Sequence, residues 1–142
     1  MARKTAGNLA TRYLDLLSEE GYRPKLDESD PRHAVITFKA EGKSVLLFID
    51  EDDESFLHLG VAFDLGNLDG AAALDQANQV NEELKVVKVT ICLPDRAVRF
   101  NVEVFLEKGP AGMALLQRGI GALRSAVARF FEPVRSVEHL DA

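Results

Sequence analysis

The chain has 142 residues, of which 46% are apolar and 28% charged, and its net charge at neutral pH is −6. This length and composition predict one globular domain over residues 1–142, with a core at about 8–131 and short, loosely held tails. The acidic balance argues against nucleic acid as a partner, because phosphate binding depends on Lys and Arg. It also argues against anionic membranes, and no apolar run approaches the roughly 20 residues that cross a bilayer. Without a signal-peptide core, a cytoplasmic location is expected.

The first half of the chain predicts a helix followed by strands. An apolar stripe at helical spacing predicts a helix over residues 8–20, with Asn8 as its cap and Gly21 as its stop. A short extended segment, "YRPKL", comes next. Alternating apolar side chains then predict a hairpin with a tight turn at Glu41-Gly42. The strands expected here cover residues 34–39, 43–50 and 55–63.

The second half predicts helix, strands and helix. Asp69 is the expected cap of a helix whose buried face consists of Ala71, Leu74, Ala77 or Asn78, Asn81 and Leu84. Two strands follow, over residues 85–93 and 96–106, with a turn at Pro94-Asp95. A last helix is predicted from Pro110 to about Phe131, before Pro133. The order helix–strands–helix–strands–helix predicts an α+β fold in which helices pack on a mostly antiparallel sheet.

Five consecutive carboxylates, Asp50 to Glu54, separate two of the predicted strands. An EF-hand calcium loop would need glycine at its sixth position and glutamate at its twelfth, where this chain has Ser55 and Val61. Adjacent carboxylates repel one another and favour water, so a solvated turn is the main interpretation. Two alternatives stay open: a site for a divalent metal or small ligand in this turn, and an enzyme site that uses Asp50, Asp52, Asp53 and His58.

Other candidates for chemistry have simpler structural explanations. Cys92 is the only cysteine and lies in a predicted strand, which favours a structural thiol. His58 alternates onto the less apolar side of its strand, beside Phe56 and Gly60. Gly119 and Gly121 interrupt the last helix, where each costs about 1 kcal/mol relative to alanine. They therefore indicate close packing, either within the fold or in a dimer.

One feature exceeds these explanations, since two predicted strands are apolar on both faces. "VLLFI" and "VVKVTICL" place Leu46, Phe48, Val86 and Cys92 on the side opposite the expected core. An antiparallel sheet with helices on one side normally has a polar second face. Either helices cover both faces of the sheet, or one face meets another chain. We favour the second interpretation, in which these four residues form an apolar surface for a protein partner or for a second copy of the chain.

The chain resembles the YbjN-type family of small bacterial proteins, putative sensory-transduction regulators with the fold of type III secretion chaperones. The resemblance covers about residues 8–131 and lies in "LLSEEGYRPKLDE", "EGKSVLLFIDEDDESF", "ALDQANQVNEELKVVKV" and "VRFNVEVFLE". Its most family-like part is the helix carrying Ala77, Asn78 and Asn81, followed at once by an apolar strand. It implies an interaction domain, often dimeric, that holds a partner segment or regulates a process.

The expected function is therefore non-enzymatic and needs no cofactor. The protein is expected to act as a chaperone-like or regulatory adaptor in the bacterial cytoplasm, with a protein partner and as a homodimer. Besides the metal or small-ligand alternative, a structural subunit of a larger assembly stays open.

Overall fold

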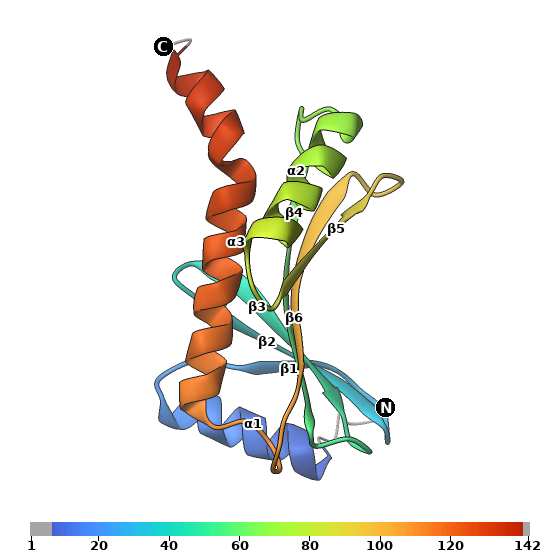
Figure 1. Cartoon of the computed structure of the whole chain (residues 1–142). Helices are drawn as coiled ribbons and strands as arrows, with labels where there is room; N and C mark the ends of the chain where they lie inside the picture. Colours follow the sequence, from blue (N-terminus) through green and yellow to red (C-terminus); the bar gives the residue numbers. More distant parts are fainter. Residues whose placement is uncertain (1–6, 141–142) are drawn as a thin grey trace.

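The structure, a computed structural model, describes the backbone of residues 7–140 and their side chains except at positions 28 and 134–140. Within this part of the chain, three helices pack on one six-stranded sheet, which confirms the predicted α+β class and element order (Figure 1). The elements are α1 (Asn8–Glu19), β1 (Lys25–Ser29), β2 (His33–Ala40), β3 (Lys43–Asp50), β4 (Phe56–Asp64), α2 (Gly70–Glu83), β5 (Val87–Cys92), β6 (Ala97–Phe105) and α3 (Met113–Leu140).

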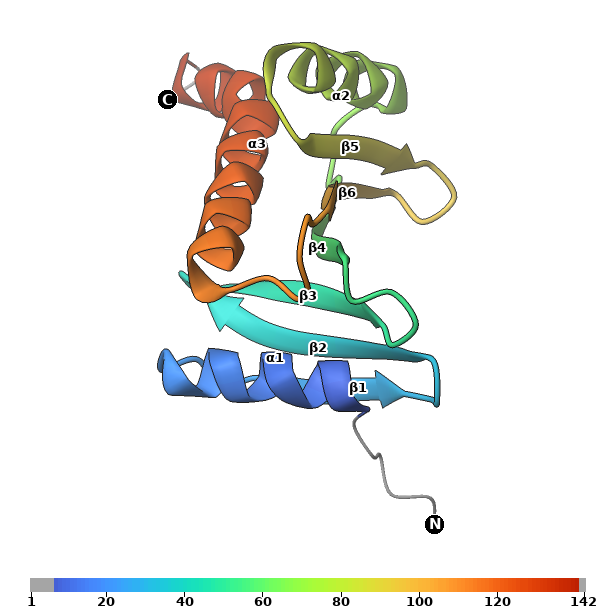
Figure 2. The same cartoon turned by 60° about the horizontal axis from the view of Figure 1, so that its bottom comes forward.

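All neighbouring strands are antiparallel, and their order in the sheet is β1-β2-β3-β4-β6-β5 (Figure 2). The first four strands are joined by local turns, whereas α2 connects β4 to the far edge, from which β6 returns to lie beside β4. The β2–β3 turn has positive φ at both central residues, 54° at Glu41 and 79° at Gly42. Such a turn matches the twist of the strands that it joins, and it confirms the predicted hairpin.

The core lies on one face of the sheet. Directly paired residues of five strands form a row of buried apolar side chains: Ile36, Leu47, Leu59, Val102 and Val87. On this face α1 packs against β2 and β3, α2 against β5, and α3 against β4, β5 and β6. Because strand side chains alternate, every second residue points to the other face, where no described helix packs. We call that side the open face.

A carboxylate of the acidic run caps α1. Glu51 accepts hydrogen bonds from the backbone N–H groups of Leu9 (2.8 Å) and Ala10 (3.0 Å). The prediction that Asn8 caps this helix is wrong, since the cap residue is Gly7 and makes no side-chain cap hydrogen bond. A carboxylate at a helix N-terminus satisfies orphan donors and complements the helix dipole. The cap therefore comes from a residue far away in the sequence.

The predicted face of α2 is partly wrong. Asp69 caps the helix as expected, because its Oδ2 accepts from the Ala72 N–H. The buried residues are Ala73, Ala77 and Val80, whereas the side chain of Leu74 is 49% exposed. This helix is rich in alanine, so its apolar periodicity distinguishes poorly between neighbouring faces.

The last helix is longer than predicted. It starts at Met113, three residues after Pro110, and its backbone remains helical through Pro133 to Leu140. The prediction that it ends near Phe131 is therefore wrong. Proline removes one helical hydrogen bond, and here the helix continues past that loss. Residues 1–6 and 141–142 of the predicted loose tails lie outside the described residues.

Two close contacts fix helices against the core. The buried Tyr13 hydroxyl of α1 accepts a hydrogen bond from the Ala111 N–H just before α3 (2.8 Å), and burial raises the pKa of Tyr13 above its ordinary value of 10.0. In α3, a Cβ on Gly119 would lie 2.8 Å from Leu59 Cδ1. Gly119 therefore allows close packing within the fold, whereas Gly121 has no such contact, since a Cβ there would lie 3.6 Å from Arg124 Nη2.

A side chain of α2 covers the outer edge of β5. The Asn81 amide bonds the backbone of Val89 twice, donating to its carbonyl oxygen (3.0 Å) and accepting from its N–H (2.8 Å). These two groups lie on the side of β5 that has no neighbouring strand. Asn81 thus takes the place of a seventh strand at the centre of this edge.

Candidate functional site

The open face contains a hollow of about 510 Å³ between β3 and β5. Its floor includes Gly60, where a Cβ would lie 2.9 Å from Asn101 Oδ1 and 3.2 Å from Phe48 Cε2. Any larger residue at this position would push these side chains apart. The principal side chains around it are Leu46, Phe48, His58, Lys88, Thr90, Arg99, Asn101 and Glu103. The hollow therefore combines an apolar end on β3 with a polar end on β5 and β6.

Aromatic rings extend from this hollow across the open face. Phe48 and His58 are paired residues of β3 and β4, and their ring centroids lie 4.3 Å apart. The rings continue through Phe56, 6.2 Å from His58, to its cross-strand partner Phe105, 5.6 Å further on. Phe105 is 85% exposed. Among the described residues, this aromatic row is thus half-buried at Phe48, His58 and Phe56 and open to solvent at Phe105.

The polar end is organised around His58 and Glu103. His58 Nε2 lies 2.9 Å from Asn101 Oδ1 and 3.6 Å from Glu103 Oε1, and the other Glu103 oxygen is 3.6 Å from Lys88 Nζ. Both neighbours of Nε2 are oxygen acceptors, so the ring donates from this nitrogen. His58 therefore acts as a flat ring packed on Phe48, with a polar edge held by β6.

The four residues predicted as one surface occupy different parts of the molecule. Leu46 and Phe48 lie together in the open face and are half-buried. Val86 precedes β5 with a φ of 76°, so strand alternation does not determine its direction, and it is 58% exposed. Cys92 ends β5 beyond the hollow, where its Sγ donates to Asp95 Oδ2 (3.2 Å). The open face therefore brings together only the β3 pair.

Phe56 and Phe105 were missing from the predicted surface. In the sequence Phe56 is close to His58, and Phe105 lies between the apolar residues Val104 and Leu106, which point to the other face of β6. The alternation itself contains the signal, because Arg99, Asn101, Glu103 and Phe105 share a parity. An aromatic residue that follows three polar ones on the same face indicates an exposed aromatic side chain.

The acidic turn is built as a cap and a turn. Asp50 Oδ1 accepts from the Asp52 N–H and Asp53 Oδ1 from the Ser55 N–H, while Glu51 caps α1. Across the described residues, no group of three or more His, Cys, Asp or Glu side chains is placed to hold a metal ion. His58, the fourth residue of the enzyme alternative, contacts Asn101 and Glu103 instead. Among the described residues, the metal alternative thus lacks an assembled ligand cluster, and the four residues of the enzyme alternative do not converge, because His58 bonds to β6.

No helix in the described part of the chain is both long enough and apolar enough to cross a membrane.

The described residues define a class of protein: an α+β domain in which helices cover one face of the sheet. The family model named YbjN, described as "Putative bacterial sensory transduction regulator", matches residues 14–136. The chain belongs to this family, which confirms the resemblance seen in the sequence. The family is described as regulatory and not as a family of enzymes. A search of the curated proteins found no match.

A solved structure has the same fold. It is the crystal structure of an uncharacterized protein from Methanothermobacter thermautotrophicus, with a TM-score of 0.66 and 10% sequence identity. The match covers 90% of this chain and 97% of that one. At this identity the likeness establishes the shared fold alone.

Proposed function

We propose that this protein is a non-enzymatic adaptor or regulator that captures an extended, aromatic-rich segment of a partner protein on the open face of its sheet. In this proposal the whole chain forms one domain. The single cluster of buried residues from Leu9 to Phe130 supports this. The regulatory description of the family agrees with such a role. The observation that carries it is the uncovered aromatic row of Phe48, His58, Phe56 and Phe105.

The chemistry of the open face favours this occupant. Half-buried Leu46 and Phe48 offer apolar contact beside the hollow, and Phe105 gains most from being covered because 85% of it is exposed. Lys88, Arg99 and Glu103 surround the polar end, where they can fix the position of a partner's charged groups. Aromatic side chains beside charged groups are the usual composition of a protein–protein contact.

The test is capture of the partner by wild-type protein and by two variants of the open face, Phe48→Asp and Phe105→Asp. A carboxylate at either position would be desolvated by a bound apolar segment, so crosslinked capture from bacterial cytoplasm should fall sharply. Leu74→Asp is the matched control, since it makes a similar change at an exposed apolar residue of α2. Circular dichroism reports whether each variant is folded.

The two variants keep the test decisive. If Phe48→Asp unfolds the protein, the more exposed Phe105→Asp still probes the same surface. Equal capture by folded Phe105→Asp and by Leu74→Asp would refute the open face as the binding site. Light scattering of the purified chain examines the second candidate, a homodimer formed through this face, because the same two variants should then yield monomers.

A further inference from the structure

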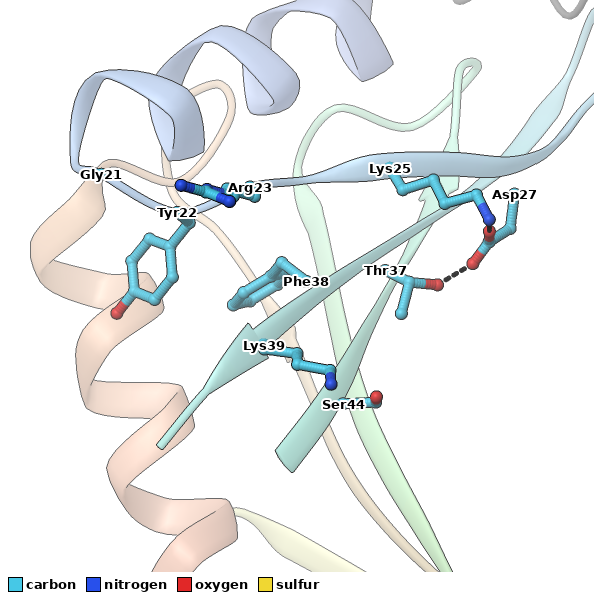
Figure 3. Close-up of a pocket in the computed structure, with 9 residues that line it drawn as sticks. All are labelled: Gly21, Tyr22, Arg23, Lys25, Asp27, Thr37, Phe38, Lys39 and Ser44. Atoms are coloured by element: carbon cyan, nitrogen blue, oxygen red, sulfur yellow. Dashed lines mark hydrogen bonds and ion pairs between the residues drawn. The ribbon is translucent and has the colours of Figure 1, made fainter. Parts of the chain in front are cut away.

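A second hollow lies near the β1 edge of the sheet, at the opposite end of the strand order from β5, between β2 and the segment that leads into β1. It measures about 610 Å³ and is lined by Gly21, Tyr22, Arg23, Lys25, Asp27, Thr37, Phe38, Lys39 and Ser44. Pairing of β1 with β2 stops at Lys25 and Thr37. Beyond this pair the two segments diverge, and Figure 3 shows the resulting wedge, with Arg23 and Lys39 on either side of Phe38.

The charge of this hollow is opposite to that of the chain. Arg23, Lys25 and Lys39 contribute three positive charges in a protein of net charge −6, against the single carboxylate of Asp27. Asp27 lies 3.9 Å from Lys25 Nζ. No described carboxylate is within ion-pair distance of Arg23 or Lys39. Both cations thus line this hollow from opposite sides of Phe38, without an ion-pair partner among the described residues.

The other lining groups favour a small ligand with oxyanion groups. An arginine fork binds two oxygens of one phosphoryl or carboxylate group, and a lysine adds a point charge. The Ser44 hydroxyl is next to Lys39, since these residues are paired across β2 and β3. Tyr22, whose ring packs edge-on against Phe38 at 5.3 Å, forms an aromatic wall. The volume is within the roughly 300–1,000 Å³ of small-molecule sites.

We propose that this wedge binds a small molecule carrying at least two negative charges on phosphoryl or carboxylate groups, with Arg23 and Lys39 as the principal ligand-binding residues. The site is separate from the proposed partner-binding row of aromatic residues. It would therefore make the protein responsive to an anionic metabolite.

The experiment is titration of the full-length protein, followed by amide chemical shifts in NMR, with pyrophosphate in one arm and citrate in the other. Sodium chloride keeps the ionic strength constant, because exposed cations attract any anion at low salt. Saturable shifts are expected at Tyr22 to Lys25, Thr37 to Lys39 and Ser44. Arg23→Gln and Lys39→Gln should each weaken binding about tenfold or more, as loss of a charged hydrogen bond predicts.

Arg118→Gln on α3 is the matched control and should leave the affinity unchanged. Saturation by pyrophosphate alone would assign the site to phosphoryl groups, and saturation by citrate alone to carboxylates. Shifts that do not saturate in either arm, or equal effects of Lys39→Gln and Arg118→Gln, would overturn the inference. Because both test residues are exposed, a change in fold is not expected, and circular dichroism verifies this.

Discussion

The two faces of the sheet are built from the same strands but follow different rules. On the covered face, the row Ile36, Leu47, Leu59, Val102 and Val87 is wholly aliphatic and buried. The adjacent row on the open face is mixed: Thr37, Leu46, Gly60, Asn101 and Lys88. The fold needs only the first of these rows to exclude water. The second is therefore available for recognition.

The largest difference is expected between one phenylalanine on each face. Phe100 is fully buried on β6, so Phe100→Ala should lower the free energy of unfolding by about 3–5 kcal/mol. Phe48 is half-buried on the open face, and Phe48→Ala should cost only about 1 kcal/mol. Urea denaturation measures both. Similar losses at the two positions would show that the open face is covered in solution.

The next largest loss of stability is expected from removing the hydrogen bond that joins α1 to the segment before α3 on the covered face. Tyr13→Phe leaves the Ala111 N–H without its buried acceptor, which should cost about 2 kcal/mol. Because burial raises the pKa of Tyr13, the folded state keeps a proton that the unfolded state loses above pH 10.0. Its contribution to stability is thus complete below that pH and declines above it. Urea unfolding over this pH range should show a shallower decline for Tyr13→Phe.

Two neighbouring carboxylates, Glu51 and Asp52, should differ in their effect on stability, because only Glu51 caps α1. Glu51→Ala removes the acceptor of two backbone N–H groups and should destabilise the protein by about 1.5 kcal/mol. Asp52→Ala is the control and should change stability by less than about 0.5 kcal/mol, because the contact of its side chain within the described residues is an exposed 3.9 Å ion pair with Arg32. Thermal melting compares the two. A larger loss for Asp52→Ala would contradict the capping role.

The two glycines of α3 should respond in opposite directions. Gly119→Ala places a methyl 2.8 Å from the buried Leu59 and should cost about 1 kcal/mol after the gain in helix propensity. At Gly121 the nearest atom to a new Cβ is Arg124 Nη2 at 3.6 Å. Gly121→Ala should therefore stabilise the protein by up to about 1 kcal/mol. The midpoints of denaturant unfolding measure both changes in stability. Stabilisation by both substitutions would exclude tight packing at Gly119.

Alternation in the sequence is enough to predict most of the sheet. Strand β3 has its predicted bounds, and the Glu41-Gly42 turn follows from residue types that accept positive φ. His58 was placed correctly on the less apolar side of β4. Local pattern decides these features because each depends only on neighbouring residues.

Long-range contacts explain what sequence reasoning missed. Glu51 caps a helix more than 40 residues away, and nothing near Asn8 reveals this. Val86 fails as a strand residue because its backbone is left-handed, a rare conformation for a β-branched residue. Leu46 and Phe48 were recognised from two-sided apolarity, but the row that joins Phe48 to Phe105 depends on register across three strands. Register is a property of the folded sheet.

The Asn81 amide has a consequence for solubility and assembly. Unpaired strand edges are where sheets of different molecules join and where aggregates begin. By occupying both polar groups of Val89, Asn81 closes the middle of the β5 edge to an incoming strand. Edge-to-edge growth into a longer sheet is thereby blocked at this point, whereas face-to-face contact across the open side remains possible. A single amide thus restricts strand addition at one of the two edges of the sheet.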